Sequence, residues 1–574
     1  MADLNLDIVC VGFGPATGGF LTTLSPALSE FAIMPQVICY ERADGLGYGV
    51  SGAVTKARGI RHSFPHLDAS QIPMAAPVAD EKVVYLFDPI GASRRSGPVR
   101  LADKLARPMS NRELYAMNLP WTPQFLHKKG GLVLSIGQFN QWVSEQLMMS
   151  GTVQVWPGMP VSEPLIDEDR VTGVRLAGQN GEPGMDIRAS LTVVGDGPVG
   201  PVGRQLDRHF GVPFGFERHE WAVGSKMVID LPDHVDLAPG TVFHTLGYPE
   251  PEIFGFLYVH PDRIASAGIF VPSWFANPLR TSYRYLQHFI QHPYLWRFLK
   301  GGRLRSWGAK SLLESGRRGE PWLVGNGYAR IGEGSGSTNV LTGSGVDEAW
   351  TTGVLLAEGV IDLLRHEAPF TKENLDRAYV QRRRQSWVEK EGQIAEHARN
   401  GFQRGFLTGM FGMGLAGVTK GIANIHPKVR KRPTVEQYFS DRIPMEELEQ
   451  VWANAKEDGV PLHDVLMDRS GWPPIPYDGQ LLVTHQDALL IGGKVQGTPG
   501  FGDHVRFIDQ ERCDLCMPQS CVDICSGEAI QPDSNGGDAP IFDREKCVHC
   551  GACLWNCDNI AFSAGGGGLH SAEN

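Results

Sequence analysis

Eight of the ten cysteines lie between Cys513 and Cys557, near the carboxyl end of a chain of 574 residues. The other two, Cys10 and Cys39, lie near the amino end. Cysteines of a disulfide framework are usually spread through the segment that they cross-link, whereas metal-binding cysteines gather at short spacings. The clustering therefore predicts a metal-binding module in a reducing compartment. A chain of this length can bury a large core elsewhere without disulfides.

The spacing within the cluster narrows the choice of metal. The second run of four cysteines has the C-x2-C-x2-C-x3-C spacing of a bacterial [4Fe–4S] ferredoxin, in which the fourth cysteine of each run ligates the other cluster. This scheme predicts one cluster on Cys513, Cys516, Cys521 and Cys557, and another on Cys525, Cys547, Cys550 and Cys553. The alternative is a pair of zinc sites. We expect His549, which lies between two of these cysteines, to form a local hydrogen bond and not to be a ligand.

The amino end has the pattern of a dinucleotide-binding fold. Residues 6–11 (LDIVCV) form an apolar run typical of a central parallel strand, and a glycine-rich turn, a helical stretch and a second strand ending at Glu41 follow. Gly12 allows the tight turn, Gly14 lets a pyrophosphate approach the backbone, and the helix amino terminus attracts its charge. Glu41 would accept hydrogen bonds from ribose hydroxyls. The alternative is a glycine-rich turn with no nucleotide.

One position departs from the usual G-x-G-x-x-G pattern, because Thr17 takes the third glycine position and Gly18 or Gly19 must ease helix–strand packing. The position of the motif at the amino end favours FAD over NAD.

Two further strand–turn–helix junctions, at residues 191–202 and 322–364, suit the ribityl chain and the isoalloxazine of FAD. The alternative for residues 325–345 is a long surface loop. The predicted cofactor contacts are Gly12, Gly14, Gly18, Glu41, Arg42, Ser51, Gly52, Asp196, Gly197, Asn339, Val340 and Gly345.

The middle of the chain predicts a second sheet. Residues 253–271 form two apolar runs joined by a turn at residues 260–263, a pattern typical of a β-hairpin. We predict an α/β flavoprotein with a Rossmann-like FAD domain of the glutathione-reductase type, an inserted antiparallel sheet for the substrate, and a carboxyl-terminal α+β ferredoxin-like domain. The expected bounds are 1–215 with 320–370 for FAD, 216–319 for the inserted sheet, 371–500 for a helical segment and linker, and 505–574 for the cluster domain.

Residues 381–432 form a basic region that surrounds a glycine-rich apolar segment at 405–418. This segment is too short to cross a bilayer, but an apolar segment flanked by Lys and Arg can lie in the membrane interface. The alternative is a core helix with a solvated basic rim.

No apolar run in the sequence reaches the length of a membrane span, and the amino end shows no pattern of a signal peptide.

Charge excludes one class of function. The formal net charge is −11, which argues against general nucleic-acid binding. Residues 501–574 carry 12 acidic and 4 basic side chains. This acidic surface either steers a basic partner or keeps the module soluble.

The order of these features resembles the electron-transfer-flavoprotein:quinone oxidoreductase family, and local matches run through nearly the whole chain. They lie at residues 50–53, 136–142, 156–158, 203–206, 339–345, 386–387, 478–480, 547–550 and 565–568. The resemblance implies an oxidoreductase that passes electrons from reduced electron-transfer flavoprotein through [4Fe–4S] clusters and FAD to quinone. It further implies peripheral attachment to the cytoplasmic face of a prokaryotic membrane through residues 405–418 and their flanking cations.

The chain also departs from this family. Members usually carry one cluster, whose ligands match Cys525, Cys547, Cys550 and Cys553, so the four cysteines left over are those of the second predicted cluster. Ser135 stands where relatives carry a basic residue before Gly137, and the passage at 325–345 is longer. The alternatives are a flavin and iron–sulfur subunit of a larger, electron-bifurcating complex, and a flavoenzyme like the geranylgeranyl reductases.

Overall fold

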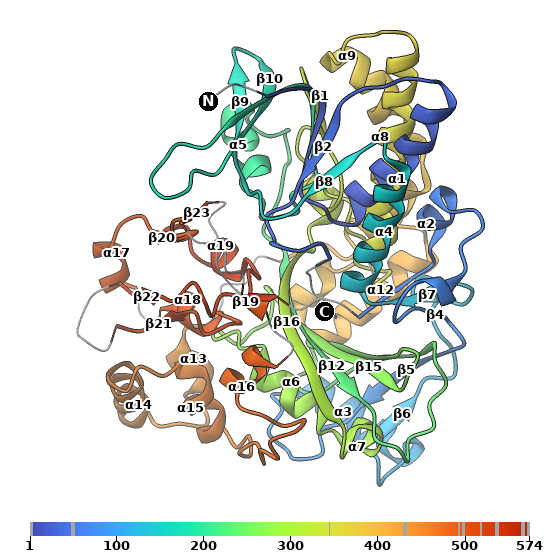
Figure 1. Cartoon of the computed structure of the whole chain (residues 1–574). Helices are drawn as coiled ribbons and strands as arrows, with labels where there is room; N and C mark the ends of the chain where they lie inside the picture. Colours follow the sequence, from blue (N-terminus) through green and yellow to red (C-terminus); the bar gives the residue numbers. More distant parts are fainter. Residues whose placement is uncertain are drawn as a thin grey trace.

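Two large sheets form the body of the molecule, with the carboxyl-terminal segments packed along one side (Figure 1). The structure is a computed structural model that describes residues 4–47, 52–343, 345–428, 433–491, 494–495, 500–516, 519–533, 539–563 and 569–570. The first sheet is shown at the top of Figure 1 and the second below it. Their junction positions the candidate site.

The first sheet has the strand order β17-β18-β11-β1-β2-β8, and β10 and β9 extend it from β11. Its central strands β18, β11, β1, β2 and β8 pair in parallel. The strands are β1 (Leu4–Val11), β2 (Val37–Tyr40), β8 (Gln154–Trp156), β9 (Val161–Asp167), β10 (Arg170–Leu176), β11 (Asp186–Val194), β17 (Val324–Gly325) and β18 (Tyr328–Arg330).

Strand β1 is buried on both faces, which explains its nearly continuous apolar sequence. Ile8 packs into the core that contains Phe20 of α1, whereas its neighbour Val9 packs into the core that contains Val202 of α5. The helices of this region are α1 (Pro15–Glu30), α2 (Arg58–Ser63), α4 (Ile136–Ser150), α5 (Pro201–Phe210) and α8 (Val346–Arg365). The Rossmann-like arrangement predicted from the sequence is confirmed.

Glycines let α1 and α8 approach closely. A Cβ atom on Gly19 would lie 2.4 Å from the carbonyl oxygen of Trp350, and one on Gly353 would lie 1.9 Å from that of Ala16. Gly18 likewise faces the Trp350 ring. The expected packing role of Gly18 and Gly19 is therefore directed at a second helix and not at a strand, because α8 covers the same face of the sheet.

The second sheet has the order β16-β12-β15-β14-β13-β5-β6. Its strands are β5 (Asp80–Leu86), β6 (Ala116–Asn118), β12 (Trp221–Asp230), β13 (Thr241–Leu246), β14 (Phe254–Val259), β15 (Ile264–Pro272) and β16 (Arg303–Leu313). Strands β14 and β15 form the expected hairpin. Strands β5 and β6 come from within the range 1–215, and β5 pairs in parallel with β13. The domain bounds drawn from the sequence stay a prediction.

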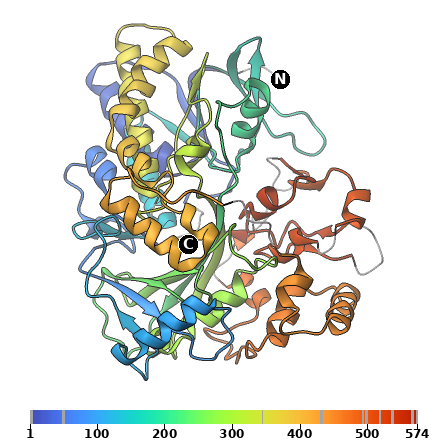
Figure 2. The ribbon, with the colours of Figure 1, turned by 180° about the vertical axis from the view of Figure 1, so that it is seen from behind.

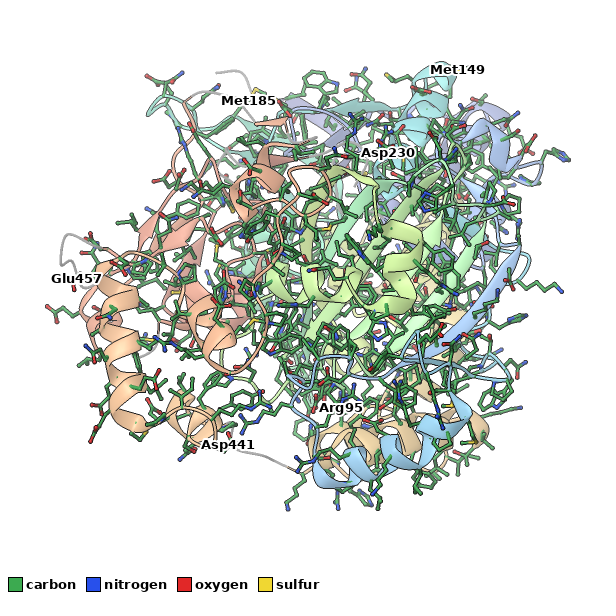
Figure 3. The ribbon with its side chains drawn as sticks, turned by 90° about the horizontal axis from the view of Figure 1, so that it is seen from below. Arg95, Met149, Met185, Asp230, Asp441 and Glu457 are labelled. Carbon is green, nitrogen blue, oxygen red and sulfur yellow. The ribbon has the colours of Figure 1, made fainter. Side chains whose placement is uncertain are left out.

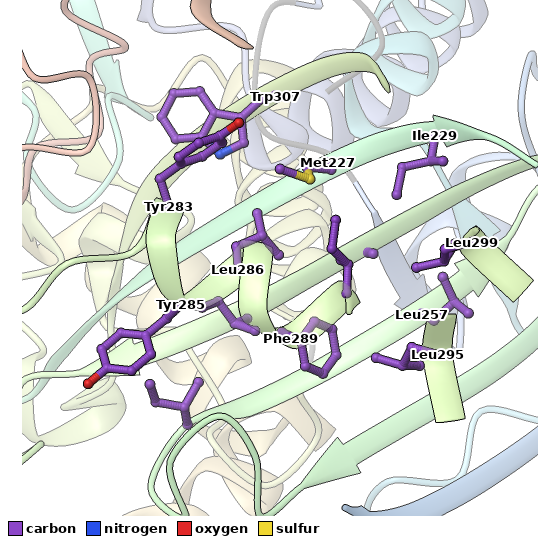
Figure 4. Packing of buried hydrophobic residues seen from close by; sticks show 14 of the residues in the cluster. Met227, Ile229, Leu257, Tyr283, Tyr285, Leu286, Phe289, Leu295, Leu299 and Trp307 are labelled. Atoms are coloured by element: carbon purple, nitrogen blue, oxygen red, sulfur yellow. The ribbon is translucent and has the colours of Figure 1, made fainter. Parts of the chain in front are cut away.

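Two helices cover the far face of this sheet, α6 (Tyr283–Ile290) and α7 (Pro293–Leu299). Leu286 and Phe289 of α6 and Leu295 of α7 pack with Met227 and Leu257 of the strands (Figure 4). A separate three-stranded sheet consists of β3 (Ala53–Thr55), β7 (Leu132–Leu134) and β4 (Ala76–Pro77). Helix α3 (Gly97–Ala106) lies between β5 and β6 in the chain.

The segments after α8 are mainly helical. They are α9 (Lys372–Leu375), α10 (Gln381–Gln385), α11 (Trp387–Ala395), α12 (Phe406–Val418), α13 (Val435–Phe439), α14 (Met445–Glu457), α15 (Leu462–Arg469) and α16 (His485–Leu490). Within the described ranges, no helix combines the length and the apolar character needed to span a membrane.

The cysteine-rich module consists of short antiparallel strand pairs and short helices. The pairs are β20 (Val505–Phe507) with β23 (Ile560–Phe562), β21 (Ile530–Gln531) with β22 (Ile541–Phe542), and β19 (Lys494–Val495) with β24 (Leu569–His570). The helices are α17 (Glu511–Asp514), α18 (Ser520–Asp523) and α19 (Ala552–Asn556). The ferredoxin-like assignment stays a prediction. The module docks on β16, where the Ser311 N–H donates to the Cys550 carbonyl at 2.8 Å and Trp555 Nε1 donates to Ser311 Oγ at 2.9 Å.

Candidate functional site

A cavity of about 470 Å³ lies between the carboxyl ends of the first-sheet strands and one face of the second sheet. Ten predicted cofactor contacts line it: Gly12, Gly14, Glu41, Arg42, Gly52, Asp196, Gly197, Asn339, Val340 and Gly345. Gly18 does not, because it packs against Trp350. Ser51 lies outside the described residues. The passage at 325–343 is mostly buried, so it is not a surface loop.

The turn after β1 is held in shape by the acid at the end of β2. Glu41 accepts hydrogen bonds from the N–H groups of Phe13 at 2.7 Å and Ala43 at 2.9 Å. Gly12 has a φ of +83°, and a Cβ there would lie 2.9 Å from the Gly195 carbonyl oxygen. A glycine is therefore required at this position. Each carboxylate oxygen can accept a second hydrogen bond, so Glu41 can still receive a ribose hydroxyl.

Two helix amino termini face the cavity without a side-chain cap. Helix α1 begins after Gly14 and α8 after Gly345, and neither capping residue accepts from the first turn. A Cβ on Gly14 would meet no atom within 4 Å, so the backbone is open to a ligand. Uncapped N–H groups and the positive end of the helix dipole bind anions. These features fit the pyrophosphate of FAD near α1 and the flavin ring near α8.

Asp196 stabilises the strand–turn–helix junction at residues 191–202. Its carboxylate accepts the N–H groups of Val202 at 2.9 Å and Gly203 at 3.0 Å, at the start of α5. Burial raises the pKa of Asp196 to about 6, against the opposing effect of these hydrogen bonds. Asp196 therefore orders the Gly197 turn that lines the cavity.

Lys226 is a functional candidate that the sequence analysis missed. It extends from β12 into the cavity, where its Nζ lies 3.4 Å from the Gly52 carbonyl oxygen and within 5.8 Å of the Phe256 and Phe270 ring centres. Among the described residues it has no carboxylate partner, and burial lowers its pKa to about 8. One feature of the sequence could have indicated this residue, because Lys226 is the single charged side chain in the run at 221–229.

The eight cysteines lie near one another in the module, and their division into two ligand sets stays a prediction. A small cavity in the module is lined by Cys525, Cys547, Cys550 and Cys553. For the other set, burial and then the neighbouring Cys557, Cys516 and Cys513 raise the pKa of the Cys521 thiol. Four thiols facing one another fit a metal cluster, because bound metal replaces their protons and offsets this repulsion.

Hydrogen bonds to sulfur support the thiolate form at these positions. Cys525 Sγ accepts the N–H groups of Ala529 and Ile530 at 3.2 and 3.3 Å. Cys547 Sγ accepts the His549 N–H at 3.4 Å and lies 3.3 Å from His504 Nε2. These are the outer contacts that tune an iron–sulfur cluster. The ligand atoms of His504, Cys547 and His549 also lie within 4.8 Å of one another, close enough to share one ion, a grouping that the sequence analysis did not consider.

The inner cysteine set borders the flavin cavity. Val548 and His549 line that cavity, and the His549 ring nitrogen Nδ1 contacts the Arg42 guanidinium. Lys310 Nζ, on β16, donates to the His549 carbonyl at 3.3 Å. The outer set reaches solvent at Cys516, which is exposed beside the 84% exposed Leu515, whereas Cys513 and Cys521 are buried.

The comparisons with known proteins bear directly on the second sheet. The family model described as "ETF-QO, ubiquinone-binding" matches residues 221–312, the segment that runs from β12 through β16. This chain is similar to the electron transfer flavoprotein–ubiquinone oxidoreductases. The resemblance to this family drawn from the sequence is confirmed.

Similarity to the family extends well beyond that segment. The mitochondrial enzyme of Arabidopsis thaliana is 28% identical over 71% of this chain and 61% of its own length. That of Oryza sativa is 27% identical over 96% of this chain and 89% of its own length. The alignment thus spans less than two thirds of the Arabidopsis relative.

One solved structure supports the fold. A geranylgeranyl bacteriochlorophyll reductase-like protein from Thermoplasma acidophilum is similar with a TM-score of 0.52, at 15% identity over 77% of this chain and all of that chain. At this identity the likeness concerns the fold alone. It supports the mixed α/β architecture predicted from the sequence.

Proposed function

We propose that this chain is an electron-transfer-flavoprotein:quinone oxidoreductase that carries FAD and two [4Fe–4S] clusters. The observation that carries the proposal is the contact between Arg42 and His549, which joins the inner cysteine set to the flavin cavity. The cavity is bounded on its other side by the sheet that matches the quinone-binding family model. One-electron centres and a quinone surface would thus adjoin one flavin site.

Bound FAD supplies the exchange of one or two electrons, which joins a one-electron donor to a two-electron acceptor. The residues of this chain hold and orient the cofactor. Glu41 would bind the ribose, the α1 amino terminus the pyrophosphate, and the turn ordered by Asp196 the ribityl chain. Lys226 would supply a positive charge to the cavity from the side of the second sheet.

An exposed apolar face supports attachment to a membrane surface. Helix α12 buries one side against Phe402 and Val99, while Leu407, Phe411 and Val418 on its other side are 40%, 67% and 85% exposed. Helix α3 lies beside it (Figure 2) and adds the exposed Leu101, Leu105 and Met109 at its end. The segment at 405–418 is therefore buried on one side, as the core alternative expected, and open on the other.

Cations flank this apolar face, as an interfacial helix requires. The exposed flanking residues are Arg404, Lys420 and Lys428, whereas Arg430, Lys431 and Arg432 lie outside the described residues, as does the glycine run at 565–568. We propose that this face rests on the cytoplasmic side of a prokaryotic membrane, where quinone is available.

An anaerobic assay tests the activity. The purified chain, loaded with FAD and iron, is mixed with reduced electron-transfer flavoprotein from its own host and a short-chain quinone. We expect electron transfer that requires both proteins, and at least a tenfold loss in Cys525→Ala but not in the control Cys10→Ala, because Cys10 lies in the first-sheet core. Failure of the fully loaded protein would overturn the proposal.

The outward position of the second cysteine set favours one alternative, a subunit of a larger redox complex. Cys516 and Leu515 are exposed, so a protein partner can approach this set directly. Cys521→Ala removes one ligand of this set only. If electron transfer from the flavoprotein to quinone is unchanged in this variant, the outer set serves a different partner. A geranylgeranyl-reductase-like activity has the support of the fold alone.

A further inference from the structure

A second large cleft, of about 680 Å³, lies apart from the flavin cavity and has no part in the proposed electron transfer. It is bounded by the loop after β5, by α3, and by the chain around α13. Figure 3 labels Arg95 beside α3 and Asp441 at the edge of the facing helical segment. Its base is apolar, with Phe87, Phe275 and Ala276 among the lining residues.

Cations dominate the walls of this cleft in a protein whose formal net charge is −11. Six basic side chains line it against four acidic ones. Two of the acids are already paired, since Asp103 contacts Arg95 at 2.5 Å and Asp441 contacts Arg94 at 3.0 Å. A third, Asp88, accepts backbone N–H groups of its own loop. The unpaired cations are Arg100, Lys104, Arg107 and Arg442, none of which forms an ion pair within the described residues.

Guanidinium nitrogens at the cleft lack acceptors. Arg94 Nη1, Arg95 Nε and Arg107 Nη1 are buried and have no hydrogen-bond partner among the residues that the structure describes. A buried donor without an acceptor is costly, and native structures usually supply one. The buried Glu250 accepts the Arg94 backbone N–H at 2.6 Å, and burial raises the pKa of Glu250 to about 8. Glu250 therefore adds little negative charge at neutral pH.

The cleft adjoins the apolar face described above. Arg100 and Lys104 alternate along α3 with Leu101 and Leu105, whose side chains are 59% and 68% exposed. A ligand whose anionic group enters the cleft could therefore leave an apolar portion on the exposed face of α3. Arginine clusters bind phosphate through several charge-assisted hydrogen bonds.

We propose that this cleft binds a phosphate ester, presented either by the headgroup of an anionic phospholipid or by a soluble metabolite. The lipid case rests on the proposed membrane surface, whereas the soluble case does not. The apolar rim on α3 favours the lipid.

The first arm measures phosphate binding in solution. Equilibrium dialysis of the cofactor-loaded full chain with glycerol 1-phosphate is compared with that of Arg100→Gln/Lys104→Gln. The control, Arg61→Gln/Lys300→Gln, removes two exposed cations that lie outside both the cleft and the surface of α12. We expect one saturable site in the wild type and in the control, and at least a tenfold weaker one in the cleft variant.

The second arm measures co-sedimentation with vesicles of phosphatidylcholine alone or mixed with phosphatidylglycerol. If the source is lipid, glycerol 1-phosphate competes with the phosphatidylglycerol-dependent binding, and the cleft variant loses more of it than the control. Saturable glycerol 1-phosphate binding without competition assigns the site to a soluble phosphate ester. Equal behaviour of the cleft variant and the control in both arms overturns the inference, whereas failure to bind any vesicle overturns the proposed membrane surface instead.

Discussion

The guanidinium of Arg42 contacts the ring of His549, although 507 residues separate them in the chain. Arg42 follows the acid at the end of β2, and His549 lies between two cysteines of the inner set. Burial lowers the pKa of Arg42, and the neighbouring Glu41 and Cys547 partly offset this effect. This contact fixes the distance between the flavin cavity and the nearest candidate cluster.

Replacement of Arg42 should slow internal electron transfer. In Arg42→Ala the module loses one anchor on the first sheet, so we expect the rate from one-electron donor to quinone to fall at least tenfold with iron content unchanged. Stopped-flow spectroscopy and iron analysis measure the two quantities. The exposed Arg61→Ala is the matched control, and equal rates in both variants would refute the assignment.

His504 should raise the reduction potential of the inner cluster. A hydrogen bond to a ligand sulfur stabilises the more negative reduced state, so His504→Phe, which keeps a ring to stack on His549, should lower the midpoint potential. A net hydrogen-bond contribution of ~1 kcal/mol corresponds to a shift of about 40 mV for one electron. A redox titration followed by electron paramagnetic resonance measures it, with the exposed His219→Phe as control. An unchanged potential contradicts the prediction.

Lys226 should cost stability at neutral pH. Its folded pKa of about 8 lies below the usual value of 10.5, so the folded state binds fewer protons than the unfolded state between these values. The penalty is therefore full below about pH 8 and fades as pH rises toward 10.5. We expect the cofactor-free Lys226→Met to be more stable than wild type by about 2 kcal/mol at pH 7, and the difference to shrink by pH 10.

Thermal unfolding between pH 7 and pH 10 tests this prediction, with a substitution of the exposed Lys300, Lys300→Met, as the control. A constant difference between Lys226→Met and wild type would show that the amine is not responsible. In the cofactor-loaded protein the same variant should bind FAD more weakly, because the cavity loses a positive charge.

The contact between α1 and α8 should not tolerate a methyl group. In Gly353→Ala the new Cβ would lie 1.9 Å from the Ala16 carbonyl oxygen, so the helices must separate. We expect a loss of about 2–3 kcal/mol and weaker FAD retention, because α1 presents its amino terminus to the cavity. The control is Gly392→Ala on α11, where no atom lies within 4 Å and helix propensity should make the change neutral or stabilising. Denaturation and flavin release measure both effects.

The local spacing of residues predicted much of the site. The glycines after β1, the acid after β2 and the division of the cysteines each depend on short segments whose geometry follows from sequence. Lys226 and His504 could not be assigned in this way, because their roles arise from contacts between distant strands and loops. The partner of Gly18 was missed for the same reason, since only the folded chain brings α8 onto α1.

The parallel pairing of β5 with β13 limits how the chain can be divided into independent pieces. The chain enters the second sheet at residues 80–118, returns to the first, and enters the second again at β12. Without residues 216–319, β5 would lose its pairing with β13. In a separate piece of residues 216–319, β13 would be an unpaired edge strand on that side. The segment that matches the ubiquinone-binding family model therefore does not form the complete second sheet by itself, and an excised piece of residues 216–319 would lack β5 and β6.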